Sequence, residues 1–259
     1  MSRPSTSGDR VTWRHLWAGL THDRDHGPLA GILSVLTIIA GLVDATSLLR
    51  LDRVFVANVT GSVIFIGLAI VGARGFSLAA PFIALASFLI GAGIGGRISA
   101  RHVTHRGRGA YAACLAQFSD LLLASVIVLF DHHPTDPVRL TLVGILALGM
   151  GAKSALVRSV NVPGLTTAVV TTTLTGLASE GASGSWRSTN FAIRLLAAGA
   201  LLVGAIVGGA LVIFLERWTA LAAADVLALG AAIWARSAAR STESWTVPAD
   251  PGGGQFTRK

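Results

Sequence analysis

Apolar residues fill most of the chain in long runs, separated by short stretches of charged residues, glycine or proline. There are eight such runs, at about residues 29–49, 55–73, 78–96, 110–130, 138–157, 163–179, 191–215 and 218–235. A helix needs about 20 predominantly apolar residues to cross a bilayer. The pattern therefore predicts an all-α integral membrane protein in which six runs form spanning helices.

The second and sixth runs differ from the others because polar residues crowd their first halves. Asn58, Thr60 and Ser62 interrupt the second run, and asparagine, proline and several threonines from residue 161 to residue 173 interrupt the sixth. Backbone groups freed by a helix break need partners inside a membrane. We therefore expect these two runs to be interrupted or re-entrant segments.

Similar positions recur in the two halves of the chain. The matching positions lie about 105 to 113 residues apart: Gly41 and Gly151, Thr60 and Thr171, Gly91 and Gly204, Asp120 and Asp225. Repeated halves with broken helices are a recurring plan of transporters, with the binding site where the breaks meet. The sequence thus predicts a membrane domain over residues 29–236, built from repeats at about 29–130 and 138–236.

The positions of basic residues distinguish two topologies. Arginines are concentrated in the polar segment 1–28 and in the loop 97–109, and cytoplasmic loops carry an excess of such residues. Eight crossings would place these two regions on opposite sides, whereas six crossings place both in the cytoplasm. We expect a cell inner-membrane protein with inverted halves, both termini cytoplasmic, and a disordered tail over residues 237–259.

The composition excludes several classes of function. Hydrophobic residues make up 52% of the chain and charged residues only 13%, about half the charged share of a soluble domain. The net charge of +8 comes largely from membrane-flanking arginines, which indicates contact with lipid rather than nucleic acid. The histidines lie in tails and loops and there is a single cysteine, Cys114, so we expect no metal site, cofactor or enzymatic centre.

Asp44 is the first candidate for chemistry within the membrane. Spacings of three and four residues place it on one helical stripe with Ser34, Thr37 and Gly41. Ionisable residues in membrane segments are candidates for function. Asp44 either lines a polar cavity or pairs near the interface with one of two arginines, Arg50 and Arg53.

Lys153 is the second candidate, within the fifth run. A buried ammonium group needs a carboxylate nearby to stay charged. Asp44 occupies a nearly equivalent place in the other half, so a facing Asp44–Lys153 pair is predicted, with Asp120 as the alternative partner. Such a pair either serves transport or only locks two helices together.

The predicted substrate site lies where the two interrupted segments meet. Its residues are Asp44, Asn58, Thr60, Gly61, Lys153 and Thr171. Threonines at a helix break can bind polar solutes, or can instead bond to carbonyls of their own helix. Both roles remain open for this group.

Two pairs of glycines have the spacing of close helix contacts. Gly91 and Gly95 lie in the third run, and Gly204 and Gly208 in the seventh. Small residues at this spacing let helices approach closely. They are expected either to pack the third and seventh runs together or to form a homodimer.

Two short segments resemble motifs of the YoaK-type family of bacterial membrane proteins, namely residues 41–45 (GLVDA) and 55–61 (FVANVTG). The resemblance extends to residues 149–155 (GMGAKSA) and 170–172 (VTT), and so covers most of residues 30–235. The chain departs from the family's usual residues at Ser62, at Lys153 with Ser154, and at Thr172. The resemblance implies a multi-pass inner-membrane protein from a family of unknown function.

These features together favour a secondary transporter or channel-like carrier of a small polar solute or ion. The hypothesis depends on the repeated halves, the broken segments and the ionisable residues inside the membrane. The alternative is a membrane scaffold or assembly protein that transports nothing, in which polar residues only join helices.

Overall fold

The structure is a computed structural model that describes residues 27–102, 105–131, 134–160, 175, 189–216 and 218–246. Nearly all of the sixth apolar run lies outside these residues, and so does Thr171. The described elements are helices, in this order: α2 (Leu29–Arg50), α3 (Val59–Ile70), α4 (Ala79–His102), α5 (Arg106–Phe130), α6 (Asp136–Val160), α8 (Thr189–Phe214), α9 (Thr219–Ala239) and the 3-10 turn η1 (Ser244–Thr246).

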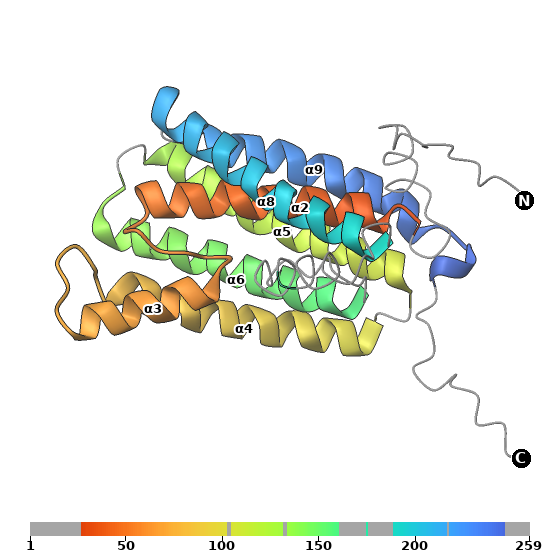
Figure 1. Cartoon of the computed structure of the whole chain (residues 1–259), viewed down its shortest axis with the longest axis horizontal. Coiled ribbons are helices and arrows are strands. Elements are labelled where there is room, and N and C mark those ends of the chain that lie inside the picture. The colour runs from red at the N-terminus through yellow and green to blue at the C-terminus, as the bar shows by residue number, and fades with distance from the viewer. Residues whose placement is uncertain are drawn as a thin grey trace, which may run out of the picture.

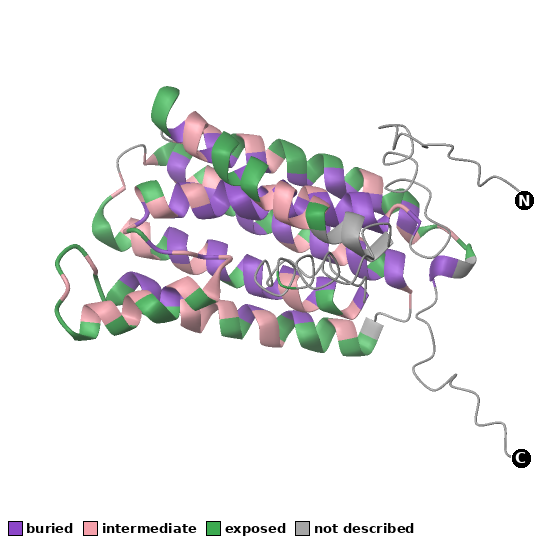
Figure 2. Cartoon of the chain, in the orientation of Figure 1, coloured by how far each residue is buried: buried purple, intermediate pink, exposed green. Residues whose placement is uncertain are grey.

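Six of the described helices are long and apolar enough to cross a membrane. They form an elongated bundle (Figure 1), in which α2 and α6 are the most buried spans and α4 and α8 the least. Exposed residues lie along the outer sides of the bundle (Figure 2), and many are leucine, isoleucine or valine. The predicted all-α, multi-pass membrane fold is confirmed.

The second apolar run enters the bundle and returns. Residues 51–58 contain no helix, and α3 has only 12 residues. At a rise of about 1.5 Å per residue, α3 is too short for a hydrocarbon core of about 30 Å. Figure 1 shows the chain turning at the end of α2, running back along the bundle, and returning through α3 to the end at which α4 begins. The predicted interruption of this segment is therefore present.

One end of the bundle gathers the start of α2, the loop between α4 and α5, and the end of α9. The Arg106 Nε donates to the carbonyl of Val160 at 2.8 Å, and a ring nitrogen of His105 lies 2.8 Å from the Ser241 carbonyl oxygen. A Cβ on Gly27, whose φ is +53°, would collide with the Trp245 ring. Most of the predicted loop 97–109 is helical, since α4 ends at His102 and α5 begins at Arg106. These two helix ends lie at the same end of the bundle as the start of α2, as six crossings require.

The end of α9 differs from the expected disordered tail. We expected disorder from residue 237, but α9 continues to Ala239, and η1 follows at Ser244–Thr246. The side chain of Trp245 is buried, and its ring nitrogen donates to Glu243 at 2.7 Å. An aromatic side chain that packs on the bundle holds this part of the tail.

The repeat predicted from the sequence is visible in the helix contacts. A Cβ on Gly91 of α4 would collide with the backbone of Leu148 in α6, and a Cβ on Gly204 of α8 would collide with the backbone of Ile38 in α2. Gly204 follows Gly91 by 113 residues, and Leu148 follows Ile38 by 110. Corresponding backbone positions are therefore in contact in the two halves.

The second glycine of each pair repeats the contact one turn later. Gly95 lies against the backbone of Ala152, and Gly208 lies against that of Leu42. The expectation that these glycines pack the third and seventh runs together is wrong, and the homodimer stays a prediction. Each glycine face packs on the first helix of the opposite half, α4 on α6 and α8 on α2, so these faces are already covered within one chain.

Candidate functional site

Asp44 holds the break before α3. It is buried, and its Oδ1 accepts hydrogen bonds from the backbone N–H groups of Val56 (3.0 Å) and Ala57 (2.8 Å). Inside a membrane these N–H groups would otherwise lack partners. Arg50 instead donates to the carbonyl of Val212 at 3.0 Å, and neither Arg50 nor Arg53 forms an ion pair with Asp44 within the described residues.

The other oxygen of Asp44 is open. Its Oδ2 is buried and has no hydrogen-bond partner among the described residues, although the Asn58 side chain lies beside the carboxylate. The hydroxyls of Ser34 and Thr37 donate to carbonyls of their own helix, at 2.7 and 2.9 Å. Those two members of the stripe are thus satisfied locally, whereas Asp44 reaches out of its helix.

Lys153 is fully buried on α6, with 1% of its surface exposed. Its ammonium group donates to the Met150 sulfur at 3.1 Å, and a thioether is a weak acceptor. Among the carboxylates, Asp120 interacts most strongly with Lys153, and Asp44 is second. The structure thus brings Asp44, Asp120 and Lys153 into one cluster, with no direct ion pair to Lys153 among the described residues.

Asp120 enters this cluster from α5 because two neighbours allow it. The Gln117 amide nitrogen lies 3.3 Å from each of its carboxylate oxygens. On the facing helix, any side chain at Gly149 would overlap the Asp120 carboxyl group. Gln117 is itself buried, and its Oε1 has no partner in the described part of the chain.

Gln117 and Gly149 were not among the residues predicted for the site. The spacing of three residues between Gln117 and Asp120 is a signal that the sequence offered. The role of Gly149 depends on which residue of α5 faces it, and a single sequence does not contain that information.

The motif at the start of α3 builds a tight hairpin. The Phe55 ring covers Gly61, where no Cβ would fit, and stacks on Phe65 with ring centroids 5.6 Å apart. The Ser62 hydroxyl donates to the Phe55 carbonyl at 2.6 Å. Gly61 therefore has a packing role, while Thr60 is exposed in the first turn. The predicted binding roles of both residues stay predictions.

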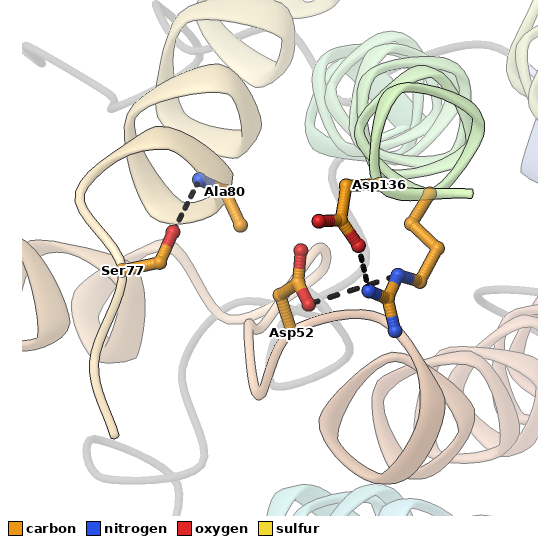
Figure 3. A network of polar contacts seen from close by, with 5 residues as sticks. Asp52, Ser77, Ala80 and Asp136 are labelled. Atoms are coloured by element: carbon orange, nitrogen blue, oxygen red, sulfur yellow. Dashed lines mark hydrogen bonds and ion pairs between the residues drawn. The ribbon is translucent and has the colours of Figure 1, made fainter.

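Ion pairs hold the turn that follows α2, where the chain folds back into the bundle. Arg139 forms ion pairs with Asp136 and with Asp52, whose carboxylate lies 3.9 Å from the Arg139 Nε. Figure 3 shows the two aspartates close together at this turn. Asp52 and Arg53 both have a φ of 54°, a left-handed conformation that is uncommon outside glycine. The ion pairs therefore tie this turn to the first turn of α6.

The described residues contain no group of three or more histidine, cysteine or acidic side chains that could hold a metal ion. The cluster itself consists of two carboxylates, one ammonium group and one amide. These groups can bind, hold or exchange protons and small polar ligands.

Comparison with known proteins identifies relatives of this chain. A family described as "Protein of unknown function (DUF1275)" matches residues 32–234. The UPF0700 transmembrane protein YoaK of Bacillus subtilis (strain 168) is 27% identical over 146 residues, which is 56% of this chain and 64% of YoaK, less than two thirds of its length. No solved structure matches. The resemblance to the YoaK-type family is confirmed.

Proposed function

The chain belongs to the DUF1275 family of unknown function, and we propose that it is a secondary transporter or channel-like carrier of a small polar solute or ion. The observation that carries this proposal is the buried cluster of Asp44, Asp120 and Lys153 beside a re-entrant helix break. The repeated halves support it, because inverted repeats with broken helices are a common transporter plan.

The energy of burial favours transport over a purely structural role. Moving charged groups out of water costs several kcal/mol each, and well-packed apolar side chains often join helices as well or better. The glycine contacts between α4 and α6, and between α8 and α2, already fasten the two halves. Because the halves are already held together, the charged cluster is not needed to join the helices. A path for a ligand explains its position beside the break better.

The proposed path runs along the break before α3 and the cluster. We propose that Asp44, Asn58, Thr60, Gly61 and Lys153 line the described side of it. The second interrupted run, with Thr171, is proposed to complete it, as the repeat implies.

The proposed location is the cell inner membrane with both termini cytoplasmic. The end that holds the loop 97–109 carries Arg97, Arg101, Arg106 and Arg108, as expected for a cytoplasmic end. Single cysteines at Ser7, His102 and His133 in a Cys114→Ser background test this. An impermeant reagent added outside should label only position 133; labelling of positions 7 and 102 from opposite sides would contradict the topology.

Transport is tested with purified protein in liposomes. Uptake of isotope-labelled alkali cations, amino acids and small carboxylates is measured for the unaltered protein, Asp44→Asn and Asp225→Asn. Asp225 is the matched control because it is an intramembrane carboxylate that accepts a hydrogen bond from Ser125, outside the cluster. We expect uptake of one class of solute, lost in Asp44→Asn and retained in Asp225→Asn.

Two results would contradict the proposal. Full uptake by Asp44→Asn would place the site elsewhere in the protein. Uptake no higher than that of empty liposomes, for every solute of the panel, would favour the scaffold.

A further inference from the structure

We propose that Asp44 takes up one proton, at Oδ2, and that this proton is the coupling ion of the carrier. The first part concerns the buried cluster alone, and the second rests on the proposed function. Three features support it: the charge of the cluster, the open oxygen of Asp44, and the donors that surround this carboxylate.

The cluster carries more negative than positive charge. Asp44 and Asp120 contribute two carboxylates, and Lys153 contributes one ammonium group. All three are buried, with 5%, 7% and 1% of their surfaces exposed. An uncompensated charge in such a place is costly, and a group there tends to become neutral instead. One proton makes the cluster neutral.

Among the described residues, Lys153 is the one cation that acts on Asp44 and Asp120. The helix α3 has no ionisable residue. Arg50 of α2 donates to a backbone carbonyl of α8. On α9, Asp225 adds only a weak repulsion to Asp120, and the remaining titratable group in range of Lys153 is the Cys114 thiol of α5. The excess negative charge therefore persists when every described neighbour is counted.

Of the two carboxylates in the cluster, Asp44 is the one with room for the proton. Asp120 has the Gln117 amide at both oxygens and the strongest interaction with Lys153. Asp44 accepts both backbone hydrogen bonds at Oδ1, and its buried Oδ2 has no hydrogen-bond partner among the described residues, although the Asn58 side chain lies beside the carboxylate. A proton on Oδ2 leaves Oδ1 able to accept from the Val56 and Ala57 N–H groups.

The surroundings of Asp44 suit a proton and not a metal cation. A hard cation needs several oxygen ligands. The groups that point at Asp44 are two backbone N–H donors, the side-chain amide of Asn58 and, further away, the Lys153 ammonium. The positive ends of these donors repel a cation but leave a bare oxygen free to form an O–H bond.

Protonation would also change how firmly the break is held. Hydrogen bonds to an ionised carboxylate are roughly twice as strong as those between neutral groups. A proton on Asp44 therefore weakens its bonds to Val56 and Ala57, and loss of the proton restores them. This links the proton to the position of the re-entrant segment, as coupling requires.

The proton is detected by infrared titration of the unaltered chain in lipid nanodiscs. A protonated carboxyl group has a C=O stretching band that a carboxylate lacks, and labelling aspartate with carbon-13 at the carboxyl shifts that band. We expect an aspartic acid band that disappears as the pH rises. It should be absent in Asp44→Asn and present in Asp225→Asn, and Asp44→Glu should restore a band that the aspartate label does not shift.

The outcomes separate this inference from the proposed function. The inference is overturned if the folded, unaltered protein shows no aspartic acid band, or if the band survives in Asp44→Asn. Uptake in liposomes is measured independently. If a proton gradient does not change solute uptake, proton coupling is refuted but the carrier function stands. If Asp44 titrates but no solute is taken up, the carrier function is refuted but the proton site stands.

Discussion

The two halves of the molecule share a helix scaffold but not the same polar residues. The glycine contacts between α8 and α2 repeat those between α4 and α6, at matching backbone positions. In the register that these contacts define, Asp44 of α2 corresponds to Ser154 of α6, and Lys153 of α6 corresponds to Val43 of α2. Asp44 and Lys153 thus occur at positions where the two halves have different residues.

A third departure from the repeat supports this comparison. Gly149 of α6, which leaves room for Asp120, corresponds to Ile39 of α2. A large side chain at that place would close the space that Asp120 occupies. The comparison teaches that close helix contacts are repeated in both halves, whereas the cluster depends on differences between them.

Replacing Lys153, one of the residues that differ between the two halves, should lower the stability of the protein most. Lys153→Met leaves two buried carboxylates without their ammonium, which should cost about 3–5 kcal/mol of unfolding free energy. Adding Asp120→Asn should recover more of this loss than adding Asp44→Asn, because Asp120 interacts more strongly with Lys153. Reversible unfolding in mixed micelles measures each free energy.

The control for this cycle is Lys153→Met with Asp225→Asn. The two losses should add almost completely, since the carboxylate of Asp225 is bonded to Ser125 and repels Asp120 only weakly. If the stability losses also add when Lys153→Met is combined with Asp44→Asn and with Asp120→Asn, these residues do not interact as a cluster.

Leucine at the close-contact glycines should damage both halves equally. Gly91→Leu and Gly204→Leu place a side chain against backbone atoms of α6 and α2, at a cost of about 3 kcal/mol each. Gly96→Leu and Gly209→Leu are the matched controls, because nothing lies within 4 Å of a Cβ at either position. Unequal losses from Gly91→Leu and Gly204→Leu would contradict the equivalence of the two contacts.

A methyl group at Gly149 should displace Asp120. Gly149→Ala is expected to cost about 2 kcal/mol, because its Cβ would overlap the Asp120 carboxyl group. In an Asp120→Ser background the loss should largely disappear. If Gly149→Ala is neutral in the unaltered chain, Asp120 does not lie against α6 as described.

Asp44→Asn should have the smallest effect on stability. An amide oxygen can still accept from Val56 and Ala57. At a pH at which Asp44 is ionised, the loss is therefore that of charge assistance, about 1 kcal/mol. Hydrogen exchange should be faster at these two amides than in the unaltered chain, and unchanged in the middle of α6. Slower or unchanged exchange at both amides would show that Asp44 does not hold the break.

Much of the fold was predictable because the bilayer restricts what a chain can do. Runs of apolar residues indicated the six spans, and polar residues within the second run indicated its break before α3. The repeat was visible through glycines such as Gly91 and Gly204, since backbone contact tolerates little else. The partners of those glycines were predicted wrongly, because spacing within one helix does not identify the facing helix.

The site was less predictable, for a related reason. Asp44 and Lys153 were recognisable because ionisable residues are rare in membrane spans. The preference of Lys153 for Asp120, and the bonds from Asp44 to Val56 and Ala57, depend on side-chain directions and on a loop that folds back. Such contacts between distant segments leave no periodic pattern in a single sequence.

The most direct test of the account is uptake by a chain in which the differences between the halves are removed. Asp44→Ser and Lys153→Val introduce the residue of the opposite half, and Asp120→Asn leaves no charge in the cluster. The glycine contacts are untouched, and replacing buried charges by neutral side chains is often tolerated. We predict a folded, monodisperse protein whose solute uptake falls to the level of empty liposomes. Uptake equal to that of the unaltered protein would contradict the account, because it would show that these differences carry no function.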